Sequence, residues 1–379
     1  MAVNKVEING EVKLDLTADT VTAAKLAQGE TAHDASGHRI TGTMSVVQLQ
    51  LIVTVSAGAT VTATNGSKTI TGISDNTGVC TLAVPETGTW SVSATLGGQT
   101  SDIKTVSITD SYAVTLSFVS SILNNNEWSV IKFVSDAGQG TNYWSIGDRK
   151  EVTLNGTVGH LTLSNYKTYA FIIGFNHNAS VEGANRIHFQ LAKTALSGGK
   201  DVCLCDSEYN LQVYETGYFS MNSSRTNSGG WARSQMRANI CGTSLSSYSG
   251  KIIAVIPAAL RAVLKSVTKY TDNTGGRSMA SSAVKATTDY FFLLSEFEVS
   301  GSISYGNTNE KNKQAQYAYY SAGNSKIKYK HNGTSTAAFW WLRSPIASNS
   351  NSFVIVNTSG TFGYDNAYRS LGFAPGFCV

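Results

Sequence analysis

The stretch Phe339-Trp340-Trp341-Leu342-Arg343-Ser344-Pro345 is the strongest signal for the fold of the C-terminal part of this chain. Trp340 and Trp341 each bury a large ring if they point inward, and each indole N–H then needs an acceptor. Arg343 offers a fork of donors to nearby carbonyl groups or to a carboxylate. Pro345 ends a regular element because it has no backbone N–H to donate. We therefore expect these four residues to form a rigid scaffold.

The tract that follows, residues 346–379, is rich in Ser, Asn, Thr, Gly and Tyr. Residues 353–356 have the apolar pattern of a strand, and Ser359-Gly360 has that of a turn. The polar residues on either side of this strand would then lie in loops at one end of the scaffold, where binding residues are common. The tract also lacks Lys, Glu, Gln, Met and Trp, which make up about one in seven residues of the chain. Ordinary loop residues in a small polar domain are the alternative interpretation.

Five stretches of the C-terminal two-thirds follow the order of a known family: Gly229-Gly-Trp-Ala-Arg-Ser-Gln-Met-Arg237, Ile256-Pro-Ala-Ala-Leu-Arg261, Thr287-Thr-Asp-Tyr-Phe-Phe-Leu-Leu-Ser-Glu296, Trp341-Leu-Arg-Ser-Pro345 and Ala374-Pro-Gly-Phe377. Over about 150 residues, the chain resembles the C-type-lectin-like domain of many phage and gut-bacterial proteins. Part of that family resembles the variable proteins of diversity-generating retroelements, including phage tropism determinants. This resemblance implies error-prone copying of template adenines, which cannot turn Asn codons into codons for the five missing residue types.

The resemblance implies a variable ligand-binding surface at about residues 346–371. Tyr and Arg on such a surface give a large contact area at limited entropy cost, while Ser and Asn adapt their hydrogen bonds. The candidate contacts to a host-surface protein or glycan are Ile346, Ser348, Ser350, Ser352, Tyr364, Asp365, Tyr368, Arg369 and Leu371. No catalytic residue and no metal ligand is predicted.

Composition indicates a β-rich α+β multidomain fold. At 379 residues, the chain is expected to hold two or three domains. Only 14% of the residues are charged, a profile typical of extracellular or virion proteins. The net charge of +4 is spread along the chain, so nucleic acid is not an expected partner. The basic cluster Lys326-Ile-Lys-Tyr-Lys330 is expected to protect a solvated strand edge.

Residues 1–45 are predicted to form a small attachment module. The run Thr20-Val-Thr-Ala-Ala-Lys-Leu-Ala27 predicts a short helix capped by a threonine. His33, Asp34 and His38 are residue types that bind metals, but turn and surface roles are favoured. The segment resembles a module of tail and baseplate proteins from phages of Gram-positive bacteria, through Asn9-Gly10, Asp15-Leu-Thr17, Ala32-His-Asp-Ala-Ser-Gly37 and Ile40-Thr-Gly-Thr-Met44. That resemblance implies attachment to other tail or baseplate proteins.

Residues 46–119 alternate as strands do, and we predict an Ig-like β-sandwich that serves as a spacer. Turn residues such as Asn65-Gly66 and Gly97-Gly98 separate the strands, and Trp90 is expected in the core. The segment resembles the Ig-like or carboxypeptidase-regulatory-like spacers of surface and phage proteins. The predicted strands are residues 49–55, 60–63, 80–84, 89–94, 104–108 and 112–118.

Residues 120–379 are predicted to form the C-type-lectin-like ligand-binding domain. Helices are expected over residues 231–240 and 257–267. Strands are expected over residues 167–175, 186–191, 290–294 and 353–356. His177 and His188 are the only histidines expected near a site, with a structural role favoured. Glu296 and Glu298 would share one face of a strand, without an evident nucleophile or base beside them.

The five cysteines do not make a disulfide framework, because their number is odd and no spacing repeats. Strand alternation would place the thiols of Cys203 and Cys205 on one face. Buried thiols that formed in a reducing cytoplasm are the favoured interpretation. The resemblance leaves calcium open, since lectin-type folds often bind it, but no cluster of Asp and Glu ligands stands out. No other cofactor is expected.

Three functions are compatible with these features. The first is a phage receptor-binding protein of the tail fibre or tail tip, carried on the virion and trimeric for avidity. It fits an N-terminus without the apolar core of a secretory signal, and a chain without an apolar run of the roughly 20 residues that span a bilayer. The second is a bacterial surface adhesin of the same fold, which is weakened by the lack of a signal or anchor. The third is an enzyme resembling formylglycine-generating enzymes, for which Cys203/Cys205 or Cys241/Cys378 would have to be reactive. We expect no enzymatic activity.

Overall fold

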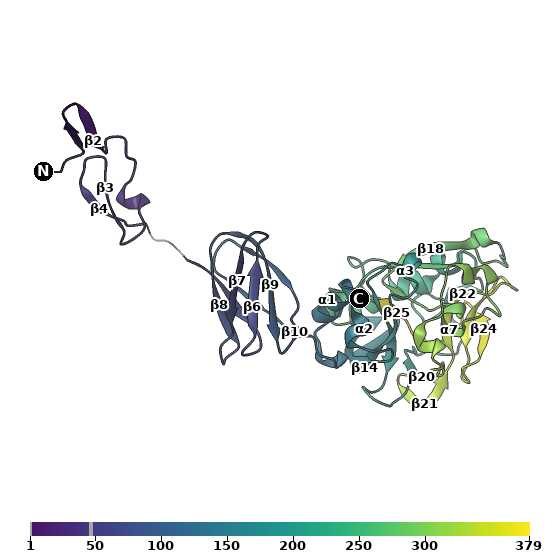
Figure 1. The fold of residues 1–379 in the computed structure, drawn as a ribbon. Coiled ribbons are helices and arrows are strands. Elements are labelled where there is room, and N and C mark those ends of the chain that lie inside the picture. The colour runs from purple at the N-terminus through teal and green to yellow at the C-terminus, as the bar shows by residue number, and fades with distance from the viewer. Residues whose placement is uncertain (1, 45–47) are drawn as a thin grey trace. The chain divides into compact units, whose positions relative to one another are not determined.

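The structure is a computed structural model that describes residues 2–44 and 48–379. The chain forms two compact units, residues 1–118 and 119–379 (Figure 1). Strands make up 38% of the chain and helices 16%, which confirms the predicted β-rich α+β multidomain fold. Among the described residues, no helix combines the length and the apolar character needed to cross a membrane.

Residues 2–44 form two antiparallel hairpins, β1 (Lys5–Ile8) with β2 (Glu11–Asp15) and β3 (Thr31–His33) with β4 (Arg39–Thr41). The prediction of a helix over residues 20–27 is wrong, since only the 3-10 turn η1 (Ala23–Lys25) is present. Thr22 and Leu26, on either side of η1, are extended. A helix this short needs tertiary packing to be stable. Among these described residues, no hydrophobic side chain is buried.

Asp34 and His38, which are residue types that can bind metals, take part in a turn of this segment. The Asp34 carboxylate accepts hydrogen bonds from the backbone N–H groups of Ser36 at 2.9 Å and His38 at 3.0 Å. The Ser36 hydroxyl also lies 2.7 Å from His38 Nδ1. These contacts confirm the predicted turn role for Asp34 and His38.

Two sheets share one core in residues 48–118. The first sheet has the order β10-β9-β6-β7, with β11 also paired to β9, and the second has the order β12-β5-β8. Side chains from both sheets, such as Leu51, Val53 and Val61, pack around the fully buried Trp90. The predicted position of Trp90 is therefore confirmed. The strands are β5 (Leu49–Thr54), β6 (Thr60–Thr64), β7 (Thr69–Ile73), β8 (Val79–Val84), β9 (Gly88–Leu96), β10 (Gln99–Thr100), β11 (Lys104–Ile108) and β12 (Tyr112–Thr115).

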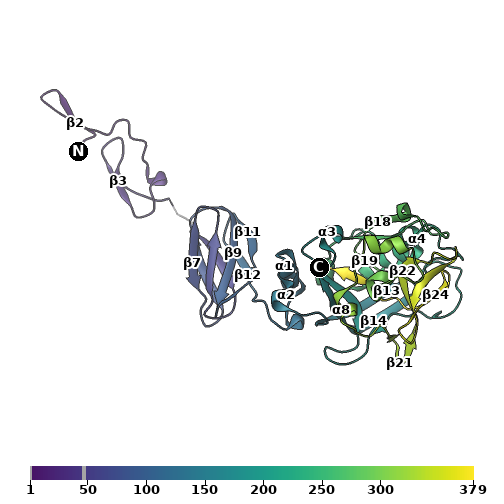
Figure 2. The ribbon, with the colours of Figure 1, turned by 45° about the vertical axis from the view of Figure 1, so that its right-hand side comes forward.

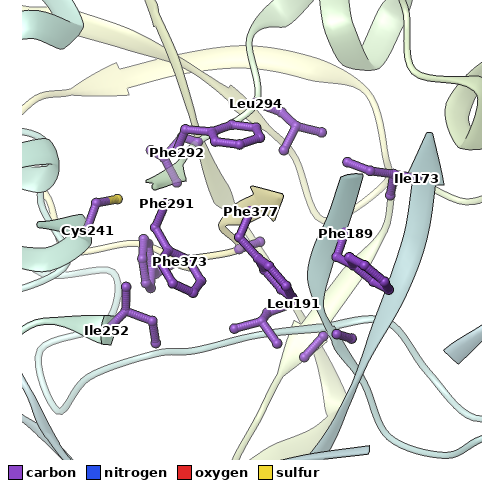
Figure 3. Close-up of a cluster of buried hydrophobic side chains, with 14 of the residues drawn as sticks. Ile173, Phe189, Leu191, Cys241, Ile252, Phe291, Phe292, Leu294, Phe373 and Phe377 are labelled. Carbon is purple, nitrogen blue, oxygen red and sulfur yellow. The ribbon is translucent and has the colours of Figure 1, made fainter. Parts of the chain in front are cut away.

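A five-stranded sheet lies at the centre of residues 119–379. Its order is β13 (Arg149–Val158), β14 (Leu161–Phe175), β15 (Ile187–Lys193), β25 (Gly376–Cys378) and β19 (Phe291–Phe292). The chain's last strand, β25, therefore lies between strands from the middle of the sequence. Figure 3 shows Phe377 of β25 among Phe189, Leu191, Phe291 and Phe373 in the core.

Smaller sheets and short helices surround this sheet (Figure 2). The small sheets are β16 (Val202–Cys203) with β20 (Lys328–Lys330) and β21 (Gly333–Ala338), β17 (Val267–Asp272) with β18 (Val284–Asp289), and β22 (Trp340–Pro345) with β23 (Ser352–Val356) and β24 (Phe362–Asn366). The α-helices are α1 (Trp128–Asp136), α2 (Gly140–Tyr143), α3 (Ala179–Glu182), α4 (Gly230–Arg233), α5 (Ile252–Val255), α6 (Ala258–Arg261), α7 (Glu296–Ser300) and α8 (Ala318–Ser321). The other helical turns are the 3-10 turns η2 (Leu123–Asn125), η4 (Ser281–Ala283) and η5 (Thr308–Asn312) and the π-helical turn η3 (Met236–Cys241).

The two predicted helices of this unit are shorter than expected. The helix expected over residues 231–240 splits into α4 and the π-helical turn η3, because Ser234 between them is extended. The helix expected over residues 257–267 ends at Arg261, and β17 begins at Val267. The four predicted strands overlap β14, β15, β19 and β23, although β19 covers only two residues of the five predicted over 290–294.

Two further predictions for this unit are wrong. Glu296 and Glu298 do not lie on a strand but in α7, where Ser295 and Glu298 form a capping box across the first turn. The cluster at residues 326–330 does not protect an edge, because β20 is the middle strand of its sheet. Lys328 is consequently buried.

Candidate ligand-binding face

The predicted scaffold residues lie on β22 and are fully buried. The Trp340 indole donates to the carbonyl of Lys326 at 3.0 Å, and the Trp341 indole donates to that of Phe219 at 2.9 Å. β22 ends at Pro345. The two indole rings are therefore buried with an acceptor each, and the strand ends at Pro345, as the sequence predicts.

Arg343 joins β22 to α7 through a buried ion pair. Its Nη1 lies 2.5 Å from Glu298 Oε2, and its Nη2 lies 2.8 Å from Glu298 Oε1. Nη1 also donates to the carbonyl of Leu293, and Nε donates to the Thr271 hydroxyl at 2.7 Å. The guanidinium thus meets both kinds of acceptor that the sequence predicts for it.

Lys269 of β17 extends this network. Its Nζ lies 2.9 Å from Glu298 Oε1, 2.7 Å from Glu182 Oε2 and 2.8 Å from the Tyr317 hydroxyl. Burial raises the pKa of Glu298, but the charges of Arg343 and Lys269 outweigh it and hold that pKa well below its ordinary value. Two cations and two carboxylates therefore balance inside the core.

His177, Glu182 and His188 form the one group of potential metal ligands found in the described part of the chain. Lys269 already places its ammonium against Glu182, where a metal ion would have to bind. Burial lowers the pKa of His188 well below its ordinary value, so its imidazole is neutral. Calcium, which prefers six to eight oxygen ligands, does not fit a buried pair of imidazoles with one carboxylate. The group is therefore part of the structural network.

Asn227, fully buried, holds the loop between β22 and β23. Its Nδ2 donates to the carbonyls of Ile346, Asn349 and Ser352 at 3.2, 3.0 and 2.9 Å. Its backbone N–H donates to the carbonyl of Ser350 at 2.9 Å. One side chain thus fixes the backbone of a loop that has no regular structure of its own.

Glu296, at the start of α7, holds a second loop in the same way. Its carboxylate accepts hydrogen bonds from the backbone N–H groups of Ser304 at 2.8 Å, Tyr305 at 3.1 Å and Gly306 at 2.8 Å. The N–H of Ala347 donates to the carbonyl of Tyr305 at 2.8 Å and joins the two loops. We name Asn227 and Glu296 the loop clamps.

The clamped loops and β24 present aromatic and polar side chains on one face. Tyr364 of β24 is 51% exposed, and its ring centroid lies 5.5 Å from that of Tyr305. A polar depression of about 220 Å³ lies beside Tyr364, lined also by Arg225, Asn351 and Asn366. A second depression of about 340 Å³ adjoins Tyr305, with the exposed Met279 in its wall. We name this surface the loop face.

The structure divides the nine predicted contact residues. Ser348, Ser350 and Tyr364 are exposed, and Asp365 and Arg369 are partly exposed. Arg369 Nε lies 3.3 Å from Asp365 Oδ1, and Arg369 Nη1 donates to Asn210 Oδ1 at 2.9 Å. Burial raises the pKa of Asp365, and the Arg369 charge acts against this rise.

The other four predicted contacts are buried, which corrects their assignment as ligand contacts: Ile346, Ser352, Tyr368 and Leu371. Ile346 and Ser352 close the loop at its base, where Ile346 N–H donates to the Ser352 carbonyl at 3.1 Å. The Tyr368 ring stacks beneath the exposed Tyr214, with centroids 5.0 Å apart. Leu371 belongs to the hydrophobic core.

Several residues of the loop face were not predicted from the sequence. Asn349, Asn351 and Asn366 lie in the tract that was singled out, so the repeated asparagines there were an available signal. Arg225 and Tyr305 lie far from that tract in sequence, and only folding brings them to it. Asn227 lies two residues before the Gly229-Gly230 pair, but no local pattern marks it as a clamp.

The four cysteines that an enzymatic function would require are buried thiols, and none is in a disulfide. Cys203 and Cys205 do face the same side, with their Sγ atoms 3.9 Å apart. Cys378 Sγ lies 3.3 Å from His188 Nδ1, but burial raises the pKa of this thiol to about 12. Burial also raises the pKa of Cys241 well above its ordinary value. The Cys241 and Cys378 thiols are therefore protonated and shielded, which does not fit a nucleophile.

Residues 201–379 match the protein family described as "Domain of unknown function (DUF6273)". The matched residues include both loop clamps, the scaffold on β22 and the whole loop face. No curated protein shows a significant match to the chain.

Proposed function

We propose that this protein is a phage receptor-binding protein that attaches to a ligand on the bacterial surface through the loop face. The observation that carries the proposal is the contrast between a rigid interior and a varied exterior. Buried clamps fix the loop backbones, while exposed Tyr, Ser and Arg side chains and partly exposed Asn side chains lie on the outside. The family resemblance noted from the sequence supports the phage context and the C-type-lectin-like fold.

The clamps favour binding because they reduce its entropic cost. A loop that is already ordered loses little freedom when a ligand binds, so more of the contact energy appears as affinity. Tyr364 and Met279 of the loop face offer exposed contact area, as does Tyr214, which stacks on Tyr368. Aromatic residues commonly dominate such interfaces. The face resembles a set of binding loops on a rigid scaffold more than a catalytic cleft.

In this proposal the other two parts of the chain connect the loop face to the virion. Residues 1–45 attach to tail or baseplate proteins, and residues 46–119 act as a spacer. The half-exposed Val3, Ile8 and Val12 in the N-terminal segment fit a module that is completed by contact with other proteins. Several copies on one particle, for example as homotrimers, would convert weak single contacts into avidity.

A cell-binding assay tests the proposal. Fluorescently labelled full-length protein is mixed with a panel of bacterial strains, and bound label is measured by flow cytometry. We expect Y364A and Y214A each to weaken binding to a recognised strain by about five- to a hundredfold, the range typical of interface anchors. The matched control is Y112A, which removes an exposed tyrosine from β12 and should leave binding unchanged.

Either of two results would contradict the proposal. Unchanged binding by the Y214A/Y364A double variant, with unchanged thermal unfolding, would show that the loop face is not the attachment surface. Binding to no strain in a broad panel that includes the natural host would contradict receptor binding itself.

A further inference from the structure

We infer that the polar depression beside Tyr364 binds a sugar residue of a bacterial surface glycan, an inference that rests on the proposed function of the loop face. The depression collects hydrogen-bonding groups from three separate segments of the chain. Asn349 and Asn351 come from the β22–β23 loop, Asp365 and Asn366 come from β24, and Arg225 comes from the segment before Asn227. Its lining is strongly polar, and Tyr364 stands at its edge.

Several hydrogen-bond donors of the depression have no acceptor in the part of the chain that the structure describes, which is the first argument. Within the described residues, the side-chain amide nitrogens of Asn349, Asn351 and Asn366 donate to no other group, although their oxygens accept hydrogen bonds. Arg225 uses only Nε, which donates to Asn366 Oδ1 at 3.2 Å, and leaves its two terminal nitrogens to solvent. A ligand that fills the depression therefore meets several donors with free hydrogen atoms.

The fixed orientation of these donors is the second argument. The Asn349 oxygen accepts from the backbone N–H of Asn351 at 3.0 Å, and the Asn351 oxygen accepts from the Ser352 hydroxyl at 2.8 Å. Since the oxygen of each amide is engaged, its nitrogen points the other way. The clamp Asn227 holds the backbone that carries both side chains. The donors are consequently arranged before a ligand arrives.

Tyr364 supplies the apolar part of the site. A pyranose ring has one face of C–H groups and a rim of hydroxyl groups, so an exposed aromatic ring beside polar amides matches its two kinds of surface. Sugar hydroxyl groups both donate and accept. Asn366 can give a hydrogen bond to one, and Asp365 can accept one from another while it stays beside Arg369.

The size and charge of the depression limit the class of ligand that it can bind. The volume of about 220 Å³ lies below the roughly 300–1,000 Å³ usual for drug-sized ligands, and it suits one ring with its substituents. The lining holds one cation, Arg225, and one carboxylate, Asp365, so it does not select strongly for an anion. A neutral monosaccharide unit is the chemistry that uses both the amides and the tyrosine.

Two measurements test the inference together. In the first, a strain that binds the protein is treated with periodate, which cleaves sugar diols, or with a broad protease, and cell binding is measured again. We expect periodate to abolish binding and protease to leave it. In the second, saturation-transfer NMR is recorded on the full-length protein with methyl glycosides of glucose, galactose, mannose and N-acetylglucosamine, and at least one should receive saturation.

Variants connect these readouts to the depression. We expect N351A and N366A each to weaken cell binding and glycoside binding by about two- to tenfold, the usual effect of one lost hydrogen bond. The matched control is N332A, which changes an exposed asparagine in the β20–β21 turn, outside the depression. Unchanged thermal unfolding of the variants shows that they remain folded.

The outcomes separate this inference from the proposed function. Binding that protease abolishes and periodate spares overturns the sugar inference but leaves receptor binding intact, with a protein as the ligand. The absence of cell binding overturns the proposed function, and the NMR measurement then still decides whether the depression takes a sugar. Saturation of no glycoside in the panel, together with periodate-resistant cell binding, rejects the inference.

Discussion

Both terminal nitrogens of Arg343 lie within hydrogen-bond distance of the Glu298 carboxylate, at 2.5 and 2.8 Å, and neither side chain is exposed. This pair fixes β22, which leads into the first clamped loop, against α7, whose first residue is the clamp Glu296. This ion pair therefore helps to connect the scaffold to the loop face, beside the hydrogen bond that the Glu296 N–H donates to the Ser344 hydroxyl. Its partners are 45 residues apart in the sequence.

We predict that R343M lowers the free energy of unfolding by about 3–5 kcal/mol, because it leaves the buried Glu298 without its main partner. Urea denaturation of the full chain, followed by tryptophan fluorescence, measures the change. The matched control is R369M, whose partner Asp365 is partly exposed, and we expect it to cost less than about 1 kcal/mol. Equal effects of the two substitutions would contradict the scaffold role of Arg343.

We predict that N227A loosens the β22–β23 loop while the rest of the unit stays folded. Three carbonyl groups of the loop lose their donor, so amide hydrogen exchange over residues 346–352 should accelerate by about tenfold or more. Exchange measured by mass spectrometry checks this, with S348A as the control in the same loop. Ser348 is exposed and its side chain makes no hydrogen bond within the described residues. Exchange that matches the wild type in N227A would rule out the clamp.

We predict that Glu310 makes the protein less stable as the pH rises through the neutral range. Burial raises the pKa of Glu310 from 4.5 to about 7, although the N–H of Asp272 and the Ser344 hydroxyl donate to its carboxylate. Between these two values the unfolded chain has lost a proton that the folded chain keeps, so stability falls as pH rises. Below pH 4.5 both states are protonated, and above about 7 the cost is constant.

The variant E310Q removes this titration. Its stability relative to the wild type should therefore increase between pH 4.5 and pH 8, by on the order of 3 kcal/mol at most. Urea denaturation at both pH values provides the measurement, and E215Q, at an exposed glutamate, is the control. A difference between E310Q and the wild type that does not change with pH would show that Glu310 ionises normally.

We predict that K328M stabilises the protein at pH 7 by about 1–3 kcal/mol. Lys328 is buried above the rings of Phe171 and Trp340, and its Nζ has no hydrogen-bond partner in the described residues. Burial lowers the pKa of Lys328 from 10.5 to about 8. Below pH 8 both states carry the charge, and the folded state bears the cost of burying it. The cation–π contacts offset part of that cost.

The advantage of K328M should shrink between pH 8 and 10.5. In this window the folded wild-type protein has lost the proton that its unfolded chain keeps, so its stability rises with pH. Denaturation at pH 7 and pH 10 compares the two proteins. K330M, which changes the partly exposed neighbour on β20, is the control and should have little effect. A destabilising effect of K328M at pH 7 would mean that the cation–π contacts outweigh the burial cost.

We predict that sibling genomes differ in this gene at codons for exposed residues of the loop face and not for buried ones. Changes should fall at positions such as Ser348, Ser350 and Tyr364, while the buried strand β23 stays constant. Sequencing the 3′ end and its neighbourhood in many related genomes tests this, and a template repeat beside a reverse transcriptase should accompany it. A uniform 3′ end without that cassette would indicate a binding face of fixed specificity.

Local patterns in the sequence were sufficient for much of the fold. Alternation predicted six of the strands in residues 48–118, because one face of a strand must be apolar to be buried, but it missed β7 and β10. The apolar run at residues 353–356 predicted β23, which is buried along its whole length. The apolar bulk of Trp90, Trp340 and Trp341 predicted their positions in the core. Pro345 marked the end of β22 because proline lacks a donor. Helix lengths were less predictable, since short helices depend on packing that no local pattern records.

The order of residues alone shows that a block of Trp and Arg precedes a tract of small polar and tyrosine residues. Which residues of that tract are exposed depends on how the whole unit folds. Tyr364 and Tyr368 have the same side chain and lie in the same tract, yet Tyr368 is buried because Tyr214, from a distant segment, packs against it. The clamps Asn227 and Glu296 and the partner of Arg343 likewise come from distant segments. The physical reason is that buried polar groups must find partners, and the chain supplies those partners only after it has folded.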